Sequence, residues 1–321
     1  MSLFASWLAS PPPDAAIEIA ADHVSVAGLS ERGQALAVQG YAVEPLPAGA
    51  VVAALTSSNI VDRTAVTSAL RAALDRAGTR PRRVALVIPD LAAKVSLVRF
   101  ETVPARRDDL DQLVRWQLKK ASPFPIEDAA VTFSPAGRGA EGGLDYLVVT
   151  ARRDVIAEYE AVCDELRVYA GLVDIATLSV VNLFLGSIDV PSGDWLVVHL
   201  RPEYTSIVIM RGADVIFFRN RPERDEESIA DLVHQTAMYY QDRLSGQRFS
   251  HVFLGGRGRA IGDVESARRN LEERLGVPVE PIDPTRTTAL TDRISATPDV
   301  MNVLAPLVGM LLRTRRAVVT A

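Results

Sequence analysis

Cysteine, lysine and histidine are all scarce in this chain of 321 residues, and each scarcity excludes a class of protein. The single cysteine, Cys163, cannot form an internal disulfide, which fits a reducing compartment. None of the three lysines follows a glycine, so the chain has no P-loop, whose Gly-Lys pair binds phosphates. The four histidines form no HExxH motif, and no cysteine pair accompanies them. We therefore expect structural histidines and no metal site.

Long apolar runs and an excess of positive charge are also missing. No stretch reaches the roughly 18 apolar residues of a membrane span, and residues 1–10 lack the positive charge of a secretory signal. The formal net charge of -5 argues against broad nucleic-acid binding, which needs a basic face. These absences predict a cytoplasmic protein that reaches a membrane only through its partners.

The first part of the chain shows an order of elements that recurs later. Ala15–Ala20, Val24–Leu29 and Gln34–Val43 have the pattern of short strands. A helix is predicted over Arg63–Ala77, because Val66, Leu70 and Leu74 recur at helical spacing, and a buried strand follows over Arg83–Ile88. The order is β-β-β-α-β.

The last third of the chain repeats this order. Strands are predicted over Trp195–Arg201, Thr205–Arg211 and Asp214–Arg219, a helix over Glu227–Leu244 and a strand over Ser250–Leu254. Further elements follow in the order helix, strand and helix: Val264–Leu275, Val277–Glu280 and Met301–Thr314. A duplicated β-β-β-α-β-α unit is typical of the actin-like, ribonuclease H-like fold.

The middle of the chain reads as a separate α+β block. It combines a strand over Ala93–Phe100, a helix over Arg107–Ala121, two short strands around a loose loop at 135–143, and a helix over Arg153–Leu166. We predict an α/β protein in which residues 1–91 and 169–190 form a first core subdomain. Residues 92–168 then form an inserted subdomain, and residues 191–321 form a second core subdomain.

Three local features each allow two interpretations. The turn Gly255-Gly256-Arg257-Gly258, which lacks the full GxGxxG pattern, brings backbone amides to a ligand or is only a tight turn. The arginine clusters at 80–83 and 313–316 are solvated ends of elements or contact anionic lipid or an acidic partner. Trp116 and residues 123–126 pack within the inserted block or form one wall of a peptide groove.

Four stretches resemble the PilM family of type IV pilus assembly proteins and, more distantly, FtsA. They are Leu113–Val131 with its Pro-Phe-Pro turn, Leu147–Asp174, Val252–Gly258 and Leu304–Leu311. The resemblance implies an actin-like fold with an inserted 1C or SHS2-like subdomain. It also implies a Mg-ATP cleft and a groove, between the first core and the inserted subdomain, for the cytoplasmic peptide of PilN. The partner-binding residues that it implies are Trp116, Gln117, Phe124, Pro125 and Ile126.

The phosphate loops depart from the pattern of that family. Ala20 replaces a glycine and Ser25 a lysine of the first loop, while His199 and Arg201 replace the aspartate and glycine of the second. Acidic residues at 223 and 225 replace a Gly-Gly pair and would repel a polyphosphate. The degenerate cleft that we predict is lined by Gly255, Gly256, Gly258, Glu18, Ala20, Asp22, His199 and Thr205.

Phosphoryl transfer depends on positioning and charge neutralisation, and these substitutions remove both. We therefore expect a non-enzymatic scaffold without a cofactor, which binds the cytoplasmic peptide of a PilN-like membrane protein at the inner membrane. One alternative is a nucleotide-switched actin-like protein that binds ATP through unusual residues. The other is a GspL-like cytoplasmic platform component, which usually continues into a transmembrane helix, whereas this chain stops at Ala321.

Overall fold

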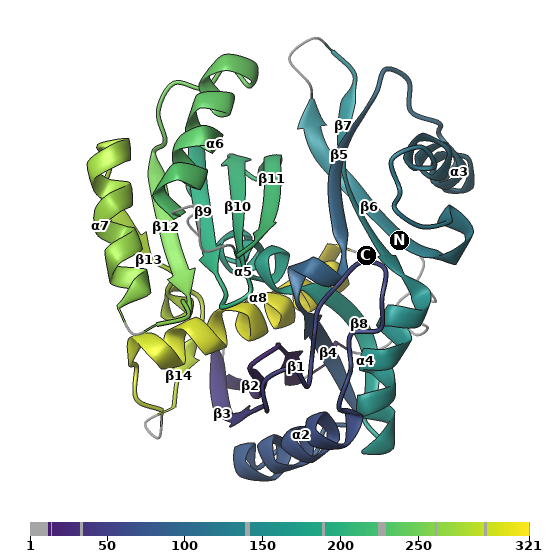
Figure 1. Ribbon diagram of the computed structural model, residues 1–321, viewed down its shortest axis with the longest axis vertical. Coiled ribbons are helices and arrows are strands. Elements are labelled where there is room, and N and C mark those ends of the chain that lie inside the picture. Colours follow the sequence, from purple (N-terminus) through teal and green to yellow (C-terminus); the bar gives the residue numbers. More distant parts are fainter. Residues whose placement is uncertain are drawn as a thin grey trace.

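The computed structural model describes residues 12–13, 15–32, 35–138, 142–187, 190–223, 229–260, 262–291 and 294–320, and Figure 1 shows their arrangement. Within these residues the strands form three sheets. The first sheet has the strand order β14-β3-β2-β1-β4-β8. Its strands are β1 (Ala15–Ile19), β2 (His23–Arg32), β3 (Ala35–Pro45), β4 (Arg83–Ile88), β8 (Tyr169–Ile175) and β14 (Ala289–Leu290).

The second sheet repeats the topology of the first, with the strand order β11-β10-β9-β12-β13. In both sheets three antiparallel strands are followed by a strand that pairs in parallel with the first of them. The expected duplicated, actin-like arrangement is therefore confirmed. The strands are β9 (Asp194–Leu200), β10 (Tyr204–Arg211), β11 (Asp214–Pro222), β12 (His251–Gly256) and β13 (Val279–Pro281).

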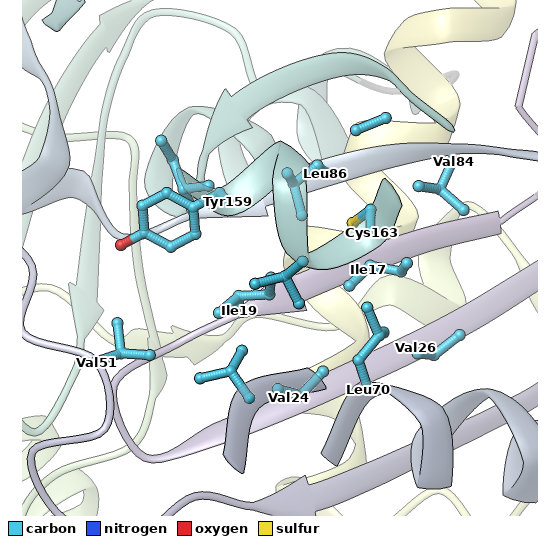
Figure 2. Packing of buried hydrophobic residues seen from close by; sticks show 14 of the residues in the cluster. Ile17, Ile19, Val24, Val26, Val51, Leu70, Val84, Leu86, Tyr159 and Cys163 are labelled. Carbon is cyan, nitrogen blue, oxygen red and sulfur yellow. The ribbon is translucent and has the colours of Figure 1, made fainter. Parts of the chain in front are cut away.

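Helix α2 (Arg63–Ala77) has the bounds that the sequence predicts, because both of its ends are marked by capping residues. The Asp62 carboxylate accepts a hydrogen bond from the Ala65 amide, and Gly78 ends the helix in the left-handed conformation. The apolar face of α2 packs on the first sheet, where Leu70 meets Ile17 and Val26 (Figure 2).

Helix α4 (Arg153–Glu165) packs differently from the predicted division, which placed it in the inserted subdomain. Its apolar face, with Tyr159 and Cys163, joins the core under the first sheet (Figure 2). Helix α4 also contacts α2 and β8. Burial raises the pKa of the Cys163 thiol to about 12. Because the spacing of apolar residues shows which face of a helix is buried but not against which sheet, the sequence did not reveal this placement.

The inserted segment itself is a three-stranded sheet covered by one helix. The strand order is β5-β7-β6, and the core of the sheet includes Leu110 and Val114 of the helix. The loose loop predicted at 135–143 is wrong in its first part, because residues up to Arg138 extend β6. The elements are β5 (Lys94–Phe100), α3 (Arg107–Leu118), β6 (Ala129–Arg138) and β7 (Leu144–Arg152).

We call the part of the molecule built on the first sheet the first half and the part built on the second sheet the second half. Two helices, α5 (Ala176–Leu185) and α8 (Pro298–Thr320), join these two halves (Figure 1). They share one apolar core with both sheets. A Cβ at Gly309 would collide with the Ser179 carbonyl oxygen, so glycine permits this close approach. Although α8 falls within the predicted second subdomain, it contacts α5 and β1 of the first half.

Helices α6 (Ile229–Arg243) and α7 (Asp263–Leu275) pack on the second sheet through a separate apolar core. Both correspond to predicted helices, and each begins or ends within two residues of the expected bounds. None of the helices in the described residues is both long and apolar enough to cross a membrane.

Candidate functional site: two clefts beside the first sheet

The predicted nucleotide cleft brings together strand ends from both halves of the molecule. β1 carries Glu18 near its end, the next turn carries Asp22, and His23 begins β2. Across the cleft, β9 leads into Arg201 and β12 ends in the turn at 255–258. In each sheet the first strand pairs in parallel with the fourth, so their carboxyl ends lie at one edge, the usual place for a ligand in such folds.

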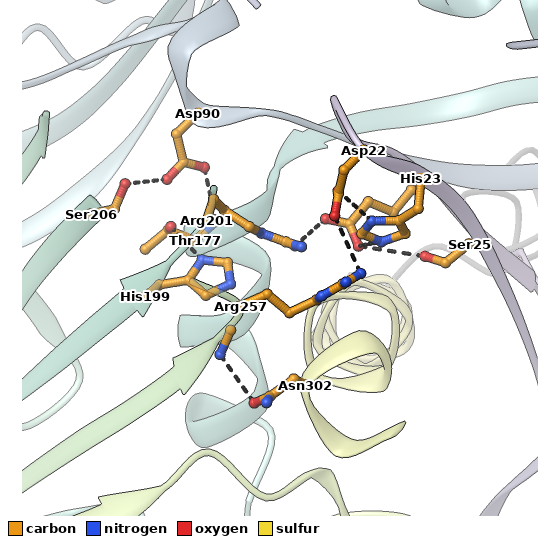
Figure 3. Close-up of polar contacts among 12 residues, drawn as sticks. Asp22, His23, Ser25, Asp90, Thr177, His199, Arg201, Ser206, Arg257 and Asn302 are labelled. Atoms are coloured by element: carbon orange, nitrogen blue, oxygen red, sulfur yellow. Dashed lines mark hydrogen bonds and ion pairs between the residues drawn. The ribbon is translucent and has the colours of Figure 1, made fainter. Parts of the chain in front are cut away.

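A buried ion pair crosses this cleft. The Arg201 guanidinium donates a hydrogen bond to the Glu18 carboxylate, and both side chains are almost completely buried (Figure 3). Burial by itself would raise the pKa of Glu18, but the charge of Arg201 and the nearby His23 ring lower it below its ordinary value. An internal carboxylate thus pairs with the cation that stands in the second phosphate loop.

Three further groups support this pair. The His23 ring lies between two carboxylates, with Nδ1 2.6 Å from Asp22 Oδ1 and Nε2 3.7 Å from Glu18 Oε2. Arg257, in the glycine turn of the other half, lies 3.2 Å from Asp22 Oδ2 (Figure 3). Burial would raise the pKa of Asp22, but His23 and the two arginines lower it to about 2.

A second polar cluster surrounds Asp90, which stands two residues after the end of β4. Its carboxylate accepts hydrogen bonds from the Thr177 amide (2.9 Å) and from the Ser206 hydroxyl (2.5 Å) of the other half. Its backbone amide donates to the Tyr204 hydroxyl, and its carbonyl accepts from Asn220. Burial raises the pKa of Asp90. The two halves therefore hold each other here through hydrogen bonds to Asp90.

The remaining predicted cleft residues are buried behind these clusters. His199 Nδ1 lies 2.8 Å from the Thr177 hydroxyl, and burial together with Arg201 lowers the pKa of this histidine well below its ordinary value, so it is neutral. Ala20 and Thr205 are also buried. A phosphate group would have to displace internal partners to reach any of the three.

The glycine turn serves backbone packing. Gly256 has a φ of 103°, and a Cβ there would collide with the Leu200 carbonyl oxygen. Its amide donates to the Asn302 side chain at 3.0 Å, so that amide is occupied (Figure 3). Gly255 packs on Ile282, and Gly258 packs on Asp263. The tight-turn interpretation accounts for each of these glycines.

A cavity of about 1020 Å³ opens beside the turn, between the two halves. Gly256 and Gly258 line it, together with Tyr41, Arg76 and the first turns of α7 and α8. Glu18, Ala20, Asp22, His199 and Thr205 do not line it. The cavity can accommodate a nucleoside, but the residues of the phosphate region do not fit Mg-triphosphate, because Glu18 and Arg201 already satisfy each other.

A second cleft lies between the inserted sheet and the first half. It is a cavity of about 410 Å³ between β6, on one side, and β8 with α5 on the other. β6 and β8 are the edge strands of their sheets, so each presents one row of backbone groups without a neighbouring strand in the described structure. Most lining side chains are apolar; the polar ones are Thr132, Ser134, Asp174, Asn182 and Arg313.

One ion pair borders this groove. The Arg313 guanidinium, from α8, donates to the carboxylate of Asp174 on β8. Burial raises the pKa of Asp174, and Arg313 opposes that effect. The C-terminal helix therefore contributes a lining side chain to the groove, although it lies more than a hundred residues after the strand in sequence.

The family model described as type IV pilus assembly protein PilM matches residues 16–223, which is more than half of the chain. The chain belongs to the PilM family. A solved structure titled PilM-PilN type IV pilus biogenesis complex is similar with a TM-score of 0.79 and 18% identity, covering 95% of this chain and 99% of that one. The cytoplasmic domain of EpsL, an inner membrane component of the type II secretion system of Vibrio cholerae, is similar with a TM-score of 0.50 and 12% identity, covering 94% of both chains.

The partner-binding residues that the PilM resemblance implied lie away from both clefts. Phe124 and Ile126 are buried in the core of the inserted sheet, which corrects their assignment to peptide contact. Trp116 (69% exposed), Gln117 and Pro125 lie on the surface around α3, and none of them lines the groove. The Pro-Phe-Pro turn therefore closes the inserted core, as the packing interpretation held.

Asp90, Ser206 and Tyr204 belong to the cleft of this PilM-family chain, although the sequence reasoning did not select them. A signal for Asp90 was present, because an acid two residues after the end of a buried parallel strand stands at the usual ligand edge. Ser206 and Tyr204 gave no such signal, since both belong to a strand in which every residue except the last, Arg211, is buried.

Proposed function

We propose that this chain is a cytoplasmic scaffold of a type IV pilus or related secretion assembly. In this role it binds the N-terminal cytoplasmic peptide of a PilN-like inner-membrane protein and does not hydrolyse ATP. One observation carries the proposal: the groove between β6 and β8 is open and apolar, and it is bordered by two edge strands. An extended peptide can pair with an edge strand through its backbone and place alternate side chains in apolar pockets.

The dimensions and polar groups of the groove support a peptide ligand. About 410 Å³ falls within the range of about 300–1,000 Å³ that ligand pockets occupy. Thr132 and Ser134 lie two residues apart on β6, which places them on the same face, and the Asp174–Arg313 pair supplies both signs of charge. The groove thus combines apolar contact with a small number of orienting groups.

The cleft between the halves supports the non-enzymatic part of the proposal. Transfer of a phosphoryl group needs neutralising cations and a positioned acid or water. Arg201 is paired with Glu18, and the Asp90 carboxylate is held by Ser206 and Thr177, so neither group is available to a substrate without breaking buried contacts.

The direct test is a calorimetric titration with the N-terminal cytoplasmic peptide of the PilN-like protein from the same organism. The variant Ser134→Arg places a long charged side chain at the groove and is expected to weaken binding at least about tenfold, the equivalent of roughly 1.4 kcal/mol. The matched control is Trp116→Ala, which removes an exposed side chain outside the groove and should leave the affinity unchanged. Equal affinities for both variants, or a loss only in the control, would contradict the proposed groove.

A further inference from the structure

A group of arginines that neither cleft uses surrounds a hollow at the outer end of the first half. Arg71 of α2, Arg80 and Arg82 before β4, and Arg167 after α4 line a cavity of about 310 Å³. We call these four residues the arginine pocket. All four side chains are exposed, and none forms an ion pair with another described residue. Asp75 is the single acid among the described residues that line this cavity.

The neighbouring acids are engaged elsewhere. Glu44 pairs with Arg76 at 2.9 Å. Glu165 forms an ion pair with Arg63 and accepts a hydrogen bond from the Thr67 hydroxyl, and the charge of Arg71 also lowers its pKa. The C-terminal ends of α2 and α4 each contribute only about half a negative charge. These groups leave a surplus of positive charge at the pocket, in a chain whose formal net charge is -5.

Arg167 occupies an unfavourable backbone position. Its φ is 57°, in the left-handed region, where the chain turns after α4 and where glycine is the usual residue. The turn is closed by hydrogen bonds from the Arg167 amide to the Asp164 carbonyl and from the Val168 amide to the Cys163 carbonyl. A side chain costs stability there that glycine would not. The charge therefore stands at a position that folding alone would assign to glycine.

An amphipathic aromatic residue adjoins the pocket. Tyr169 begins β8 and is 60% exposed, and the Arg83 guanidinium lies 5.9 Å from its ring centroid. Its amide donates to the Arg82 carbonyl, so the backbone of Tyr169 is held beside the arginines. Clustered arginines with an exposed tyrosine suit the interface of an anionic membrane, where the cations meet phosphates and the ring lies at headgroup level.

We infer that the arginine pocket binds the phosphate of an anionic phospholipid headgroup and rests this end of the first half on the membrane surface. The groove proposed above begins on the same strand: its first lining residue on β8, Leu172, follows Tyr169 by three residues, or about 10 Å. A membrane protein whose peptide occupies the groove would then be anchored close to the surface that the pocket contacts. This last step rests on the proposed peptide binding, whereas the lipid contact itself does not.

The test is sedimentation of the purified chain with vesicles of phosphatidylcholine, with and without phosphatidylglycerol. We expect binding to the anionic vesicles only, and weaker binding as salt rises. Arg71→Gln and Arg80→Gln should each lower the partition coefficient about fivefold. Arg167→Gly should lower it similarly while raising Tm, because glycine relieves the left-handed backbone. Opposite changes in binding and stability would separate the role of this residue from folding.

The matched control is Arg106→Gln with Arg107→Gln, which removes two exposed charges from the inserted subdomain. Binding to neutral vesicles, or equal losses in the control and pocket variants, would overturn the inference. A Tm increase with glycerol phosphate, lost in Arg71→Gln, without vesicle binding would assign the pocket to a soluble phosphate ester and also overturn it. The vesicles contain no PilN-like protein. A failure of lipid binding would therefore not affect the result of the peptide titration that tests the proposed function.

Discussion

The cleft between the two halves and the groove between β6 and β8 both border the first sheet, yet charged side chains close the first and apolar side chains leave the second open. In the first, Arg201, Glu18 and Asp90 find partners across the interface. In the second, two edge strands face a cavity. The difference shows that charged contacts can close one cleft of a fold while a second cleft beside the same sheet stays open.

The largest effect should come from breaking the cross-cleft pair on one side. Arg201→Met leaves the Glu18 carboxylate buried without its cation and should destabilise the chain by about 3–5 kcal/mol. Urea unfolding of the purified variant measures this loss. The double variant Glu18→Leu with Arg201→Met removes both charges and should recover most of the stability. If the double variant is as unstable as Arg201→Met, the unpaired Glu18 carboxylate is not the cause of the lost stability.

Acid should weaken the closed cleft next. The pKa of Asp22 is lowered from 3.8 to about 2, so its interactions stabilise the fold fully above pH 3.8 and are lost as the pH falls toward 2. This shift corresponds to about 2 kcal/mol. Asp22→Asn should therefore be less stable than the parent at pH 6, and the gap should narrow as the pH approaches 2. A constant gap would contradict the assigned role of this carboxylate.

The pKa of His23 shifts in the opposite direction, so its contribution to the stability of the closed cleft is lost at alkaline pH. Burial would lower it, but Asp22 and Glu18 raise it above 6.5. The stabilisation is complete below pH 6.5 and is lost as the pH rises through the folded-state pKa. The pH dependence of Tm for His23→Gln should lack this alkaline decline. If the parent and variant decline together above pH 7, the histidine is not responsible.

The open groove should respond in binding more than in stability. Val173→Asp places a charge on the half-buried face of β8 that lines the groove and should weaken binding of the PilN-like peptide about tenfold, or about 1.4 kcal/mol. Val61→Asp, at an exposed position outside both clefts, is the matched control. Calorimetry measures both affinities, and circular dichroism checks that both variants fold.

The smallest effect should be the response to Mg-ATP. Because Arg201 and Glu18 occupy the phosphate region, titration with Mg-ATP should release no heat of binding and should leave Tm unchanged. Adenosine, which lacks phosphates, serves as the control for the neighbouring cavity of about 1020 Å³. Stoichiometric binding of Mg-ATP would show that the cleft between the halves still binds nucleotide. The contrast between a closed cleft and an open groove would then no longer hold.

Local patterns predicted the elements well where capping residues mark both ends. Asp62 and Gly78 bound α2, and the duplicated order of elements predicted the topology of both core sheets. Comparison with the family pattern places Ala20 and Arg201 where that pattern has glycine, and the degenerate phosphate loops that this implies stay a prediction. These features depend on residues close together in sequence or on comparison with a motif.

What the sequence did not predict depends on long-range contacts. The Arg201–Glu18 pair joins residues 183 positions apart, and no spacing rule relates them. β8 was not predicted as a strand, because a bulge near Gly171 interrupts its pairing with β4. The family resemblance implied a peptide groove between the first core and the inserted subdomain, and a cavity does lie there. None of the five residues that the resemblance implied lines this cavity, since Phe124 and Ile126 are buried in the inserted core.

The C-terminal part of the chain returns to the first sheet, and this affects the order in which the parts of the protein can fold. β14 pairs with β3, and α8 fills the core against α5 and β1, so the first half obtains its last contacts from residues beyond 288. During synthesis the apolar side chains of Val180 and Leu183 stay exposed to solvent until Leu304 and Leu307 have left the ribosome and can pack against them. Protection of that nascent surface is therefore a requirement of this topology.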